Sequence, residues 1–166
     1  NISMPTKPDG ADWTDGSTII ERLSYRRDRI GYHPEGFRHI FVIPADGGTP
    51  HQVTDGDWNH DSFKWMPDGK SIVFQSLRVK DAEYEWRESE IYSIDVSSGE
   101  IRQLTSRKGP DSGPIPSPDG RYIAYTGYDW SRDTYTEAGI YFMRSDGSKP
   151  VRIASEMGRR PGNLTW

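Results

Sequence analysis

The sequence predicts an all-β chain, a β-propeller fragment with about three four-stranded blades. Residues 55–105 carry four short segments of strand-like composition, separated by turn residues. The pattern recurs after a shift of 51 residues, and partial copies flank the two full ones. A period near fifty residues with four strands is typical of a propeller blade, which must stack against neighbours to bury both faces. We expect the chain to start and end within a blade.

The central unit begins with an expected half-buried strand and a tight turn. Phe63 and Trp65 alternate with polar residues, which is the pattern of a strand with one apolar face. Pro67-Asp68-Gly69 then turns the chain, and we expect a positive φ at Gly69. The next segment is rich in β-branched and aromatic residues. The four expected strands are Asp61–Met66, Ser71–Ser76, Glu90–Val96 and Glu100–Thr105.

The repeat identifies the residues expected at the core. A shift of 51 residues places Trp65-Met66-Pro67-Asp68-Gly69 on Pro116-Ser117-Pro118-Asp119-Gly120, so Gly120 should also have a positive φ. It places Ile72-Val73-Phe74 on Ile123-Ala124-Tyr125. Apolar side chains at equivalent positions should pack between blades. Those expected to be largely buried are Trp65, Phe74, Ile91, Tyr92, Ile94, Ile123, Tyr125, Ile140 and Ile153.

The remaining expected strands follow from the same repeat. Ile19–Arg26, His39–Pro44 and Pro50–Thr54 correspond to the second, third and fourth strands of a preceding blade. Asn163–Trp166 corresponds to the first strand of a further blade. The expected divisions are an N-terminal arm or loop (1–18) and a partial propeller (19–166), which contains a partial blade (19–54), two blades (55–105 and 106–154) and the start of another (155–166).

Composition narrows the classes of function. The 166 residues suit one domain and carry a net charge of −4, so a broad nucleic-acid-binding surface is not expected. Cysteine is absent, which excludes disulfides and thiolate metal sites. No apolar run approaches the length of a membrane span, and no signal peptide is visible. Asn1 does not look like a natural start, so the compartment stays open.

Motifs for catalysis and metal binding are not found in the sequence. A serine nucleophile elbow needs Gly-x-Ser-x-Gly, which does not occur. Asp111-Ser112-Gly113-Pro114 looks like a trypsin-type serine fragment, but its repeat counterpart is the strand entrance at His60-Asp61-Ser62. The four histidines lack metal-ligand spacing, and Asp55, Asp57 and Asp61 lack the closing glutamate of an EF-hand loop. We expect no catalytic residue, no metal and no cofactor.

Several motifs resemble those of known propellers. Trp-Met-Pro-Asp-Gly-Lys at 65–70 and Ser-Pro-Asp-Gly-Arg at 117–121 resemble the Ser-Pro-Asp-Gly repeats of TolB-like propellers. The stretch 22–58, with Arg-His-Ile-Phe-Val-Ile-Pro-Ala-Asp-Gly-Gly at 38–48, looks like the propeller of acylaminoacyl-peptidase-like enzymes in the prolyl oligopeptidase family. In that family the propeller precedes an α/β-hydrolase domain and filters the peptides that reach a Ser-Asp-His triad. No hydrolase domain is present in this sequence. The resemblance favours a cytoplasmic protein and leaves the periplasm open.

Three functional hypotheses follow. The leading one is a non-catalytic propeller portion of a serine peptidase, which gates peptides and docks a hydrolase domain. The alternatives are a stand-alone TolB-like module that binds protein partners, and a carbohydrate-active propeller such as a lyase. The basic run at Arg22–Arg29 indicates either a solvated strand face or a contact with a peptide carboxylate or a neighbouring domain. The residues expected to contact substrate or another domain are Arg26, Arg27, Tyr32, Trp58 and His60.

The strand count also suggests an assembly. Twelve expected strands amount to three blades, whereas propellers usually have about four to eight. Two chains would supply six blades, with Asn163–Trp166 of one chain completing the blade that the other begins at Ile19. We therefore expect a homodimer, and no nucleic-acid or membrane partner. The alternatives are an open arc that associates irregularly and a piece of a larger chain.

Overall fold

The computed structural model of the chain describes residues 7–12, 19–156 and 158–166. The regular structure of these residues consists of strands, in two two-stranded and two four-stranded antiparallel sheets. The chain divides into two compact units, residues 1–35 and 36–166. Within the described ranges, no helix has the length and apolar character needed to cross a membrane.

The first unit contains one short hairpin. β1 (Arg26–Arg27) pairs with β2 (Gly31–Tyr32), and Arg26 lies opposite Tyr32. The prediction of a strand over Ile19–Arg26 was wrong for most of that segment, because only its last residue enters a ladder. Ile19 is 49% exposed and Leu23 57% exposed, so these apolar side chains are not anchored in a core.

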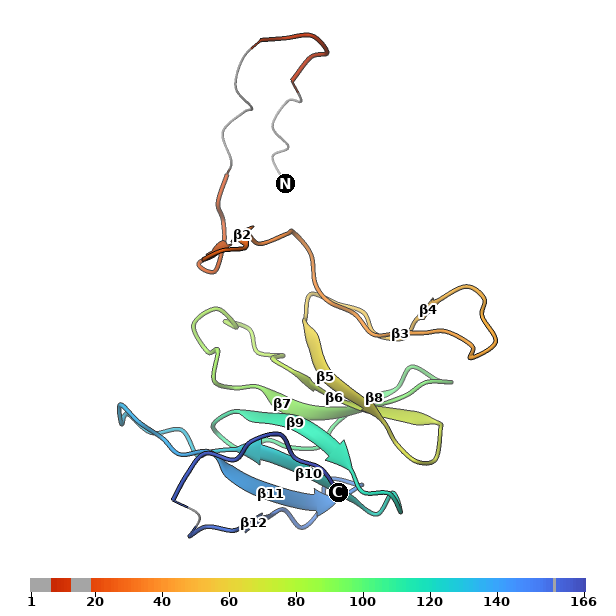
Figure 1. Cartoon of the computed structure of the whole chain (residues 1–166), viewed down its shortest axis with the longest axis vertical. Coiled ribbons are helices and arrows are strands. Elements are labelled where there is room, and N and C mark those ends of the chain that lie inside the picture. Colours follow the sequence, from red (N-terminus) through yellow and green to blue (C-terminus); the bar gives the residue numbers. More distant parts are fainter. Residues whose placement is uncertain (1–6, 13–18, 157) are drawn as a thin grey trace. The chain divides into compact units, whose positions relative to one another are not determined.

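The second unit contains the two complete blades and part of another (Figure 1). A hairpin of β3 (Phe41–Val42) and β4 (His51–Gln52) precedes them. Both four-stranded sheets are antiparallel meanders in which each strand pairs with the next in sequence. The strands are β5 (His60–Trp65), β6 (Ser71–Ser76), β7 (Glu90–Asp95) and β8 (Ile101–Gln103) in one sheet, and β9 (Asp111–Pro116), β10 (Tyr122–Gly127), β11 (Gly139–Arg144) and β12 (Val151–Ile153) in the other.

The predicted Pro-Asp-Gly turns are confirmed. Gly69 has φ 65° and Gly120 has φ 70°, and each amide donates to a carbonyl three residues earlier. Asp68 Oδ1 accepts hydrogen bonds from the amides of Lys70 (2.8 Å) and Ser71 (3.2 Å), which fixes the turn before β6 begins.

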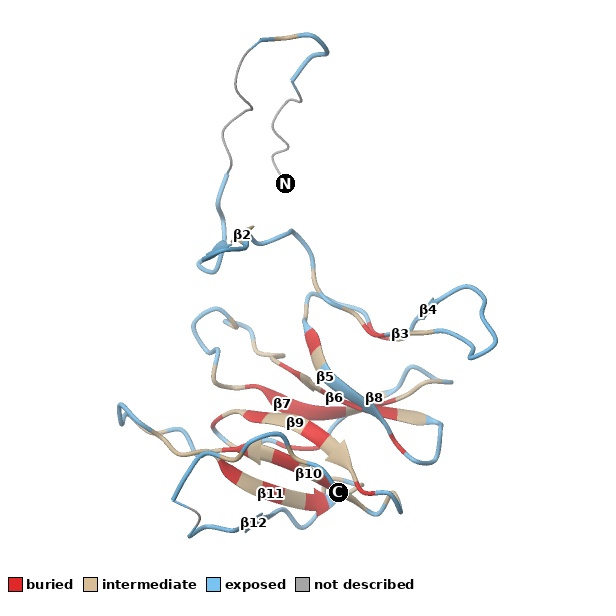
Figure 2. Cartoon of the chain, viewed as in Figure 1, coloured by how far each residue is buried: buried red, intermediate tan, exposed pale blue. Residues whose placement is uncertain are grey.

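Two apolar clusters lie on opposite faces of the β5–β8 sheet. Figure 2 shows that much of β7 in this sheet is buried. The first interface joins that sheet to Ile40, just before β3, and the second joins it to the β9–β12 sheet. Equivalent ring pairs are stacked in both: Phe74 and Tyr92 at 5.7 Å, and Tyr125 and Tyr141 at 5.5 Å. The buried members are Ile40, Ile72, Phe74, Tyr92 and Ile94 in the first interface, and Met66, Val73, Ile91, Leu104, Ile123, Tyr125, Tyr141 and Met143 in the second.

The prediction that Trp65 is buried was wrong. Its side chain is 47% exposed, and that of Phe63 is 54% exposed. A bulge near Ser62 (φ 50°) interrupts the alternation of β5, and Trp65 then pairs with Ile72 on the face of the first interface. In the 36–166 unit, the neighbouring blade contributes β3–β4, its third and fourth strands, to this face. These strands leave the end of β5 that carries Trp65 exposed.

Two predictions at the C-terminal side were also wrong in part. Ile153 is 40% exposed, whereas its repeat counterpart Leu104 is buried because the β9–β12 sheet packs over it. Ile140 is half-buried for the same reason, since no described blade covers the outer face of its sheet. Asn163–Trp166 does not form a strand, although Trp166 Nε1 donates a 3.0 Å hydrogen bond to the carbonyl of Ile115 in β9.

Candidate functional site

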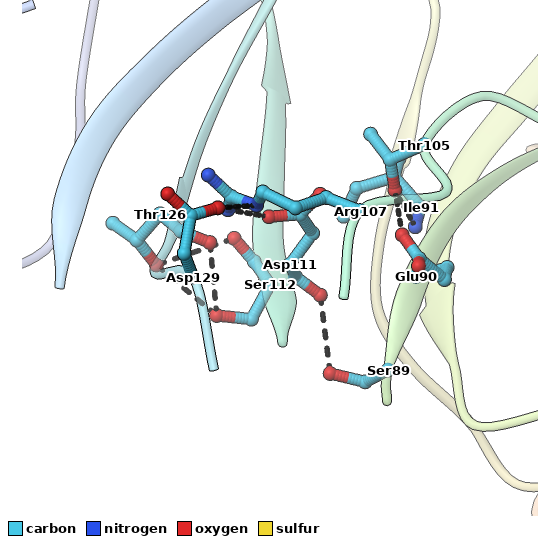
Figure 3. A network of polar contacts seen from close by, with 9 residues as sticks. All are labelled: Ser89, Glu90, Ile91, Thr105, Arg107, Asp111, Ser112, Thr126 and Asp129. Carbon is cyan, nitrogen blue, oxygen red and sulfur yellow. Dashed lines mark hydrogen bonds and ion pairs between the residues drawn. The ribbon is translucent and has the colours of Figure 1, made fainter. Parts of the chain in front are cut away.

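Polar residues gather where β7 and β9 begin (Figure 3). Thr105 Oγ1 accepts a 2.9 Å hydrogen bond from the amide of Ile91 and donates one to Glu90 Oε2. The amide of Asp111 donates to the carbonyl of Ser89 at 2.7 Å. These bonds tie the start of β7, the segment after β8 and the start of β9 together. We call Glu90, Ile91, Thr105 and Asp111 the second junction.

The same arrangement occurs 51 residues earlier. Thr54 Oγ1 accepts a 2.9 Å hydrogen bond from the amide of Ile40 and lies 3.4 Å from His39 Nδ1. His60 stands at the start of β5, where the second junction has Asp111. We call His39, Ile40, Thr54 and His60 the first junction. The threonine and isoleucine are common to both junctions, whereas the ionisable residues differ.

The two carboxyl groups of the second junction have raised pKa values. Glu90 is 7% exposed, and its burial raises its pKa to about 7 against the effect of the Thr105 hydrogen bond. Asp111 is 1% exposed, and burial raises its pKa to about 6 although Arg107 attracts its charged form. Both groups therefore change charge near neutral pH.

Arg107 is held on three sides beside this pair. Its Nη2 pairs with Asp111, its Nε lies 3.5 Å from Asp129 Oδ1, and its guanidinium lies 4.0 Å from the centre of the Tyr141 ring. Gly127, opposite Asp111 in the β9–β10 ladder, leaves room for this contact. A Cβ at Gly127 would collide with the Arg107 guanidinium and the Asp111 carboxylate.

His60 connects the first junction to Arg78 in the β6–β7 loop. Arg78 Nη2 donates to His60 Nε2 at 2.9 Å, and His60 Nδ1 lies 2.9 Å from the carbonyl of Arg38. A neutral imidazole protonated at Nδ1 satisfies both contacts, which assigns the tautomer. Burial is the main reason that the pKa of His60 is lowered, and this agrees with a neutral ring.

A cleft of about 400 Å³ lies beside Arg78, Glu90 and Arg107. Tyr92 is one of its lining residues, and the Arg78 guanidinium lies 5.3 Å from the centre of that ring. The cleft can hold a small polar ligand among three cations and two carboxyls. The charged residues that line it are Arg78, Glu88, Glu90, Arg107 and Lys108.

The residues predicted from the sequence to contact substrate lie in both units. Arg26, Arg27 and Tyr32 come together in the β1–β2 hairpin of the first unit. In the second unit, Trp58 is half-buried beside Gly56, and His60 is 3% exposed. His60 approaches the cleft through Arg78. For Arg26, Arg27, Tyr32 and Trp58 a role in binding stays a prediction.

Sequence reasoning missed Arg78, Glu90 and Arg107. A signal for one of them was present, because Glu90 and Asp111 align with His39 and His60 in the repeat. Ionisable residues at the entrances to buried strands are unusual unless they have polar partners. Arg78 and Arg107 lie in loops whose path the repeat does not specify.

Ser112, in the motif that looks like a trypsin-type serine fragment, contacts a hydroxyl of the neighbouring strand. Its Oγ lies 3.1 Å from Thr126 Oγ1 on the neighbouring strand β10. Within residues 7–12, 19–156 and 158–166, no three His, Asp or Glu side chains are placed to hold a metal ion.

The family model for the N-terminal region of dipeptidyl peptidase IV (DPP IV) matches residues 12–130. The chain belongs to this DPP IV N-terminal-region family. The family model and the four-stranded sheets confirm the predicted resemblance and the β-propeller fragment.

Relatives of this family member carry both peptidase and TolB names. An uncharacterised protein of Agrobacterium fabrum is 37% identical over 69% of this chain and 34% of its own length. The uncharacterised peptidase YuxL of Bacillus subtilis is 27% identical over 63% of this chain and 15% of its own. The Tol-Pal system protein TolB of Francisella tularensis is 30% identical over 81% and 29%. The chain thus spans about a third or less of each relative.

Solved structures agree with the fold. A TolB candidate from Agrobacterium tumefaciens is 34% identical, with a TM-score of 0.55 over 70% of this chain and 38% of its own. An oligogalacturonate lyase from Vibrio parahaemolyticus has a TM-score of 0.53 over 70% and 30%, at 14% identity. The lyase match shows a shared fold alone.

Proposed function

We propose that this chain is the propeller portion of a peptidase, where it docks a hydrolase domain and limits which peptides reach the active site. The observation that carries this proposal is the match of residues 12–130 to the DPP IV N-terminal region. The name of the relative YuxL, a peptidase, supports it. Selection by such a module would act through binding and exclusion at a distance from the chemistry.

The protein encoded by the complete reading frame tests the proposal. We expect a Gly-x-Ser-x-Gly motif in an α/β segment downstream, and hydrolysis of acyl-aminoacyl nitroanilides that is lost when that serine becomes alanine. The 166-residue chain alone should not hydrolyse them, and Ser112→Ala should change nothing.

Exclusion is tested with two substrates of one sequence. The complete protein should cleave a short peptide but not the same segment within a folded carrier. Tyr125→Ala, which loosens the second interface, should raise cleavage of the carrier relative to the peptide. Tyr135→Ala, at a side chain that is 73% exposed, is the matched control.

A stand-alone TolB-like module that binds proteins is the second candidate. The match to the Tol-Pal protein TolB favours it, because that match covers 81% of this chain. A reading frame that stops after one to three further blades, with no peptidase activity, would replace the first candidate with this one.

A further inference from the structure

Arg78 is a half-buried cation without an acidic partner within ion-pair distance among the described residues. Its contacts with His60 and the Tyr92 ring supply no full negative charge, and Asp55 attracts it only at longer range. Its buried Nε has no hydrogen-bond partner in the described part of the chain, whose ion pairs do not include Arg78. Water can bond to the N–H group but leaves the charge unpaired, and a partly buried charge favours a counter-ion.

The other groups of the cleft suit a single negative charge. Arg107 is already paired with Asp111, whereas the Lys108 ammonium lies 4.8 Å from the centre of the Trp130 ring. Glu90 has a pKa of about 7, so a large fraction of this carboxyl is protonated at neutral pH and can donate a hydrogen bond. The site therefore offers cationic and neutral donors together.

The chemistry of the ligand follows from these donors. A planar guanidinium with idle N–H groups matches a carboxylate, which can accept two bonds side by side. Glu88 and the net charge of −4 disfavour a polyanion. The volume of about 400 Å³ falls in the range of small-ligand sites.

We propose that this cleft binds a carboxylate of a peptide, either its C-terminal carboxylate or an acidic side chain. That the carboxylate belongs to a peptide rests on the proposed function, whereas the preference for a carboxylate rests on the unpaired Arg78.

Calorimetry of the 166-residue chain with three peptides tests the proposal. The peptides are acetyl-tetra-alanine with a free C-terminus, its C-terminal amide, and an amide with one aspartate in place of an alanine. If the cleft binds a C-terminal carboxylate, the free acid should bind at least about tenfold more tightly than the alanine amide. If it binds an acidic side chain, the aspartate-containing amide should bind at least about tenfold more tightly than the alanine amide. Equal affinities for all three, or no binding at millimolar concentration, would overturn the proposal.

Substitutions locate the site. Arg78→Met keeps an apolar stem over Tyr92 and removes the charge, so it should abolish the preference for the carboxylate. Arg87→Met is the matched control, because Arg87 lies in the same loop over Trp86, also has an unpartnered Nε, and does not line the cleft.

Full preference in a folded Arg78→Met protein would place carboxylate binding elsewhere and reject this cleft. If that variant does not fold by near-ultraviolet circular dichroism, Lys108→Met should weaken binding of the preferred peptide by about threefold, and unchanged affinity would count against the proposal.

The two proposals fail separately. Loss of discrimination among the peptides leaves exclusion by the propeller intact. Absence of peptidase activity in the complete protein leaves carboxylate binding by this chain measurable.

Discussion

At the first junction Thr54 caps the amide of Ile40, and at the second Thr105 caps the amide of Ile91 in the same way. Beside the threonine, the first junction has His39 and His60. The second junction has Glu90 and Asp111 at the equivalent positions (Figure 3). Equivalent backbone positions therefore accept histidine, which is positive when protonated, or a carboxylic acid, which is negative when ionised. The comparison separates the threonine cap, which is the same in both junctions, from the ionisable positions, which differ.

The two blade interfaces differ in how much of a neighbouring sheet covers them. The second is formed by two complete sheets, whereas the first receives Ile40 and the partly buried Val42 and Val53 from around β3–β4. Side chains near the β5 edge of the first interface consequently stay open to solvent.

The largest expected effect comes from Phe74, which is 0% exposed in the first interface. Phe74→Ala should lower the free energy of unfolding by about 3–5 kcal/mol, because it removes a ring stacked on Tyr92 and leaves a cavity. Trp65→Ala in the same sheet should cost only about 1 kcal/mol while that ring is half exposed. Urea denaturation of both variants measures the difference, and equal losses would show that Trp65 is covered.

The expected homodimer offers one way to cover Trp65. Light scattering at low micromolar concentration tests for it, and a monomer that persists on concentration would exclude it. If a dimer forms, Trp65→Ala should weaken it more than Tyr84→Ala, a change at a residue that is 73% exposed.

Loss of the junction hydroxyls should have the next largest effect. Thr105→Val leaves the Ile91 amide unpaired in a buried position and should cost about 1–3 kcal/mol. Thr54→Val should cost less, because Thr105 also donates to Glu90 whereas Thr54 has the longer contact to His39. Thermal melts of both proteins compare the junctions, and the reverse order would mean that the Glu90 bond does not stabilise the fold.

A smaller effect on stability is expected at the bulges of β5 and β9, the first strands of the two complete blades. Ser62 and Gly113 are repeat counterparts, with φ values of 50° and 62°. Ser62→Gly should stabilise the chain and Gly113→Ser should destabilise it, each by about 1 kcal/mol, because a side chain is strained in this conformation. Opposite signs in a denaturant titration would contradict the shared backbone geometry.

The stability of the chain should also depend on pH through Glu90 and His60. The pKa of Glu90 rises from 4.5 to about 7 on folding, so its contribution to stability is complete below pH 4.5 and is lost as pH rises through 7. The pKa of His60 is lowered from 6.5, so its contribution is present above pH 6.5 and is lost as pH falls through the lower folded value. Glu90→Gln should flatten the decline between pH 5 and 8, measured as urea midpoints, and an unchanged slope would assign the decline to another group.

Local chemistry predicted much of the fold. The expected Ser71–Ser76 matches β6, and the Pro-Asp-Gly turns have the expected φ, because each depends on neighbours in sequence. Burial was less predictable, since Trp65 and Ile153 occupy apolar repeat positions whose exposure depends on whether another blade covers them.

The candidate site was harder to predict than the fold. His60 was predicted from the sequence as a contact residue, whereas Arg78 and Arg107 reach the cleft from loops of irregular conformation. Glu90 alone was within reach of the repeat alignment, because its counterpart His39 is also ionisable and also precedes a capped isoleucine. Its raised pKa depends on burial by residues distant in sequence, which the alignment does not show.

The threonine cap has a consequence for how such chains evolve. Each hydroxyl lies 14 residues after the amide that it caps, so donor and acceptor are inherited on a single short piece of gene. Tandem duplication of a whole repeat of 51 residues therefore copies the cap complete, without compensating changes elsewhere. The ionisable positions beside the cap are then released from the need to preserve it. Selection can diversify them from copy to copy, as the histidine and carboxylate versions in this chain illustrate.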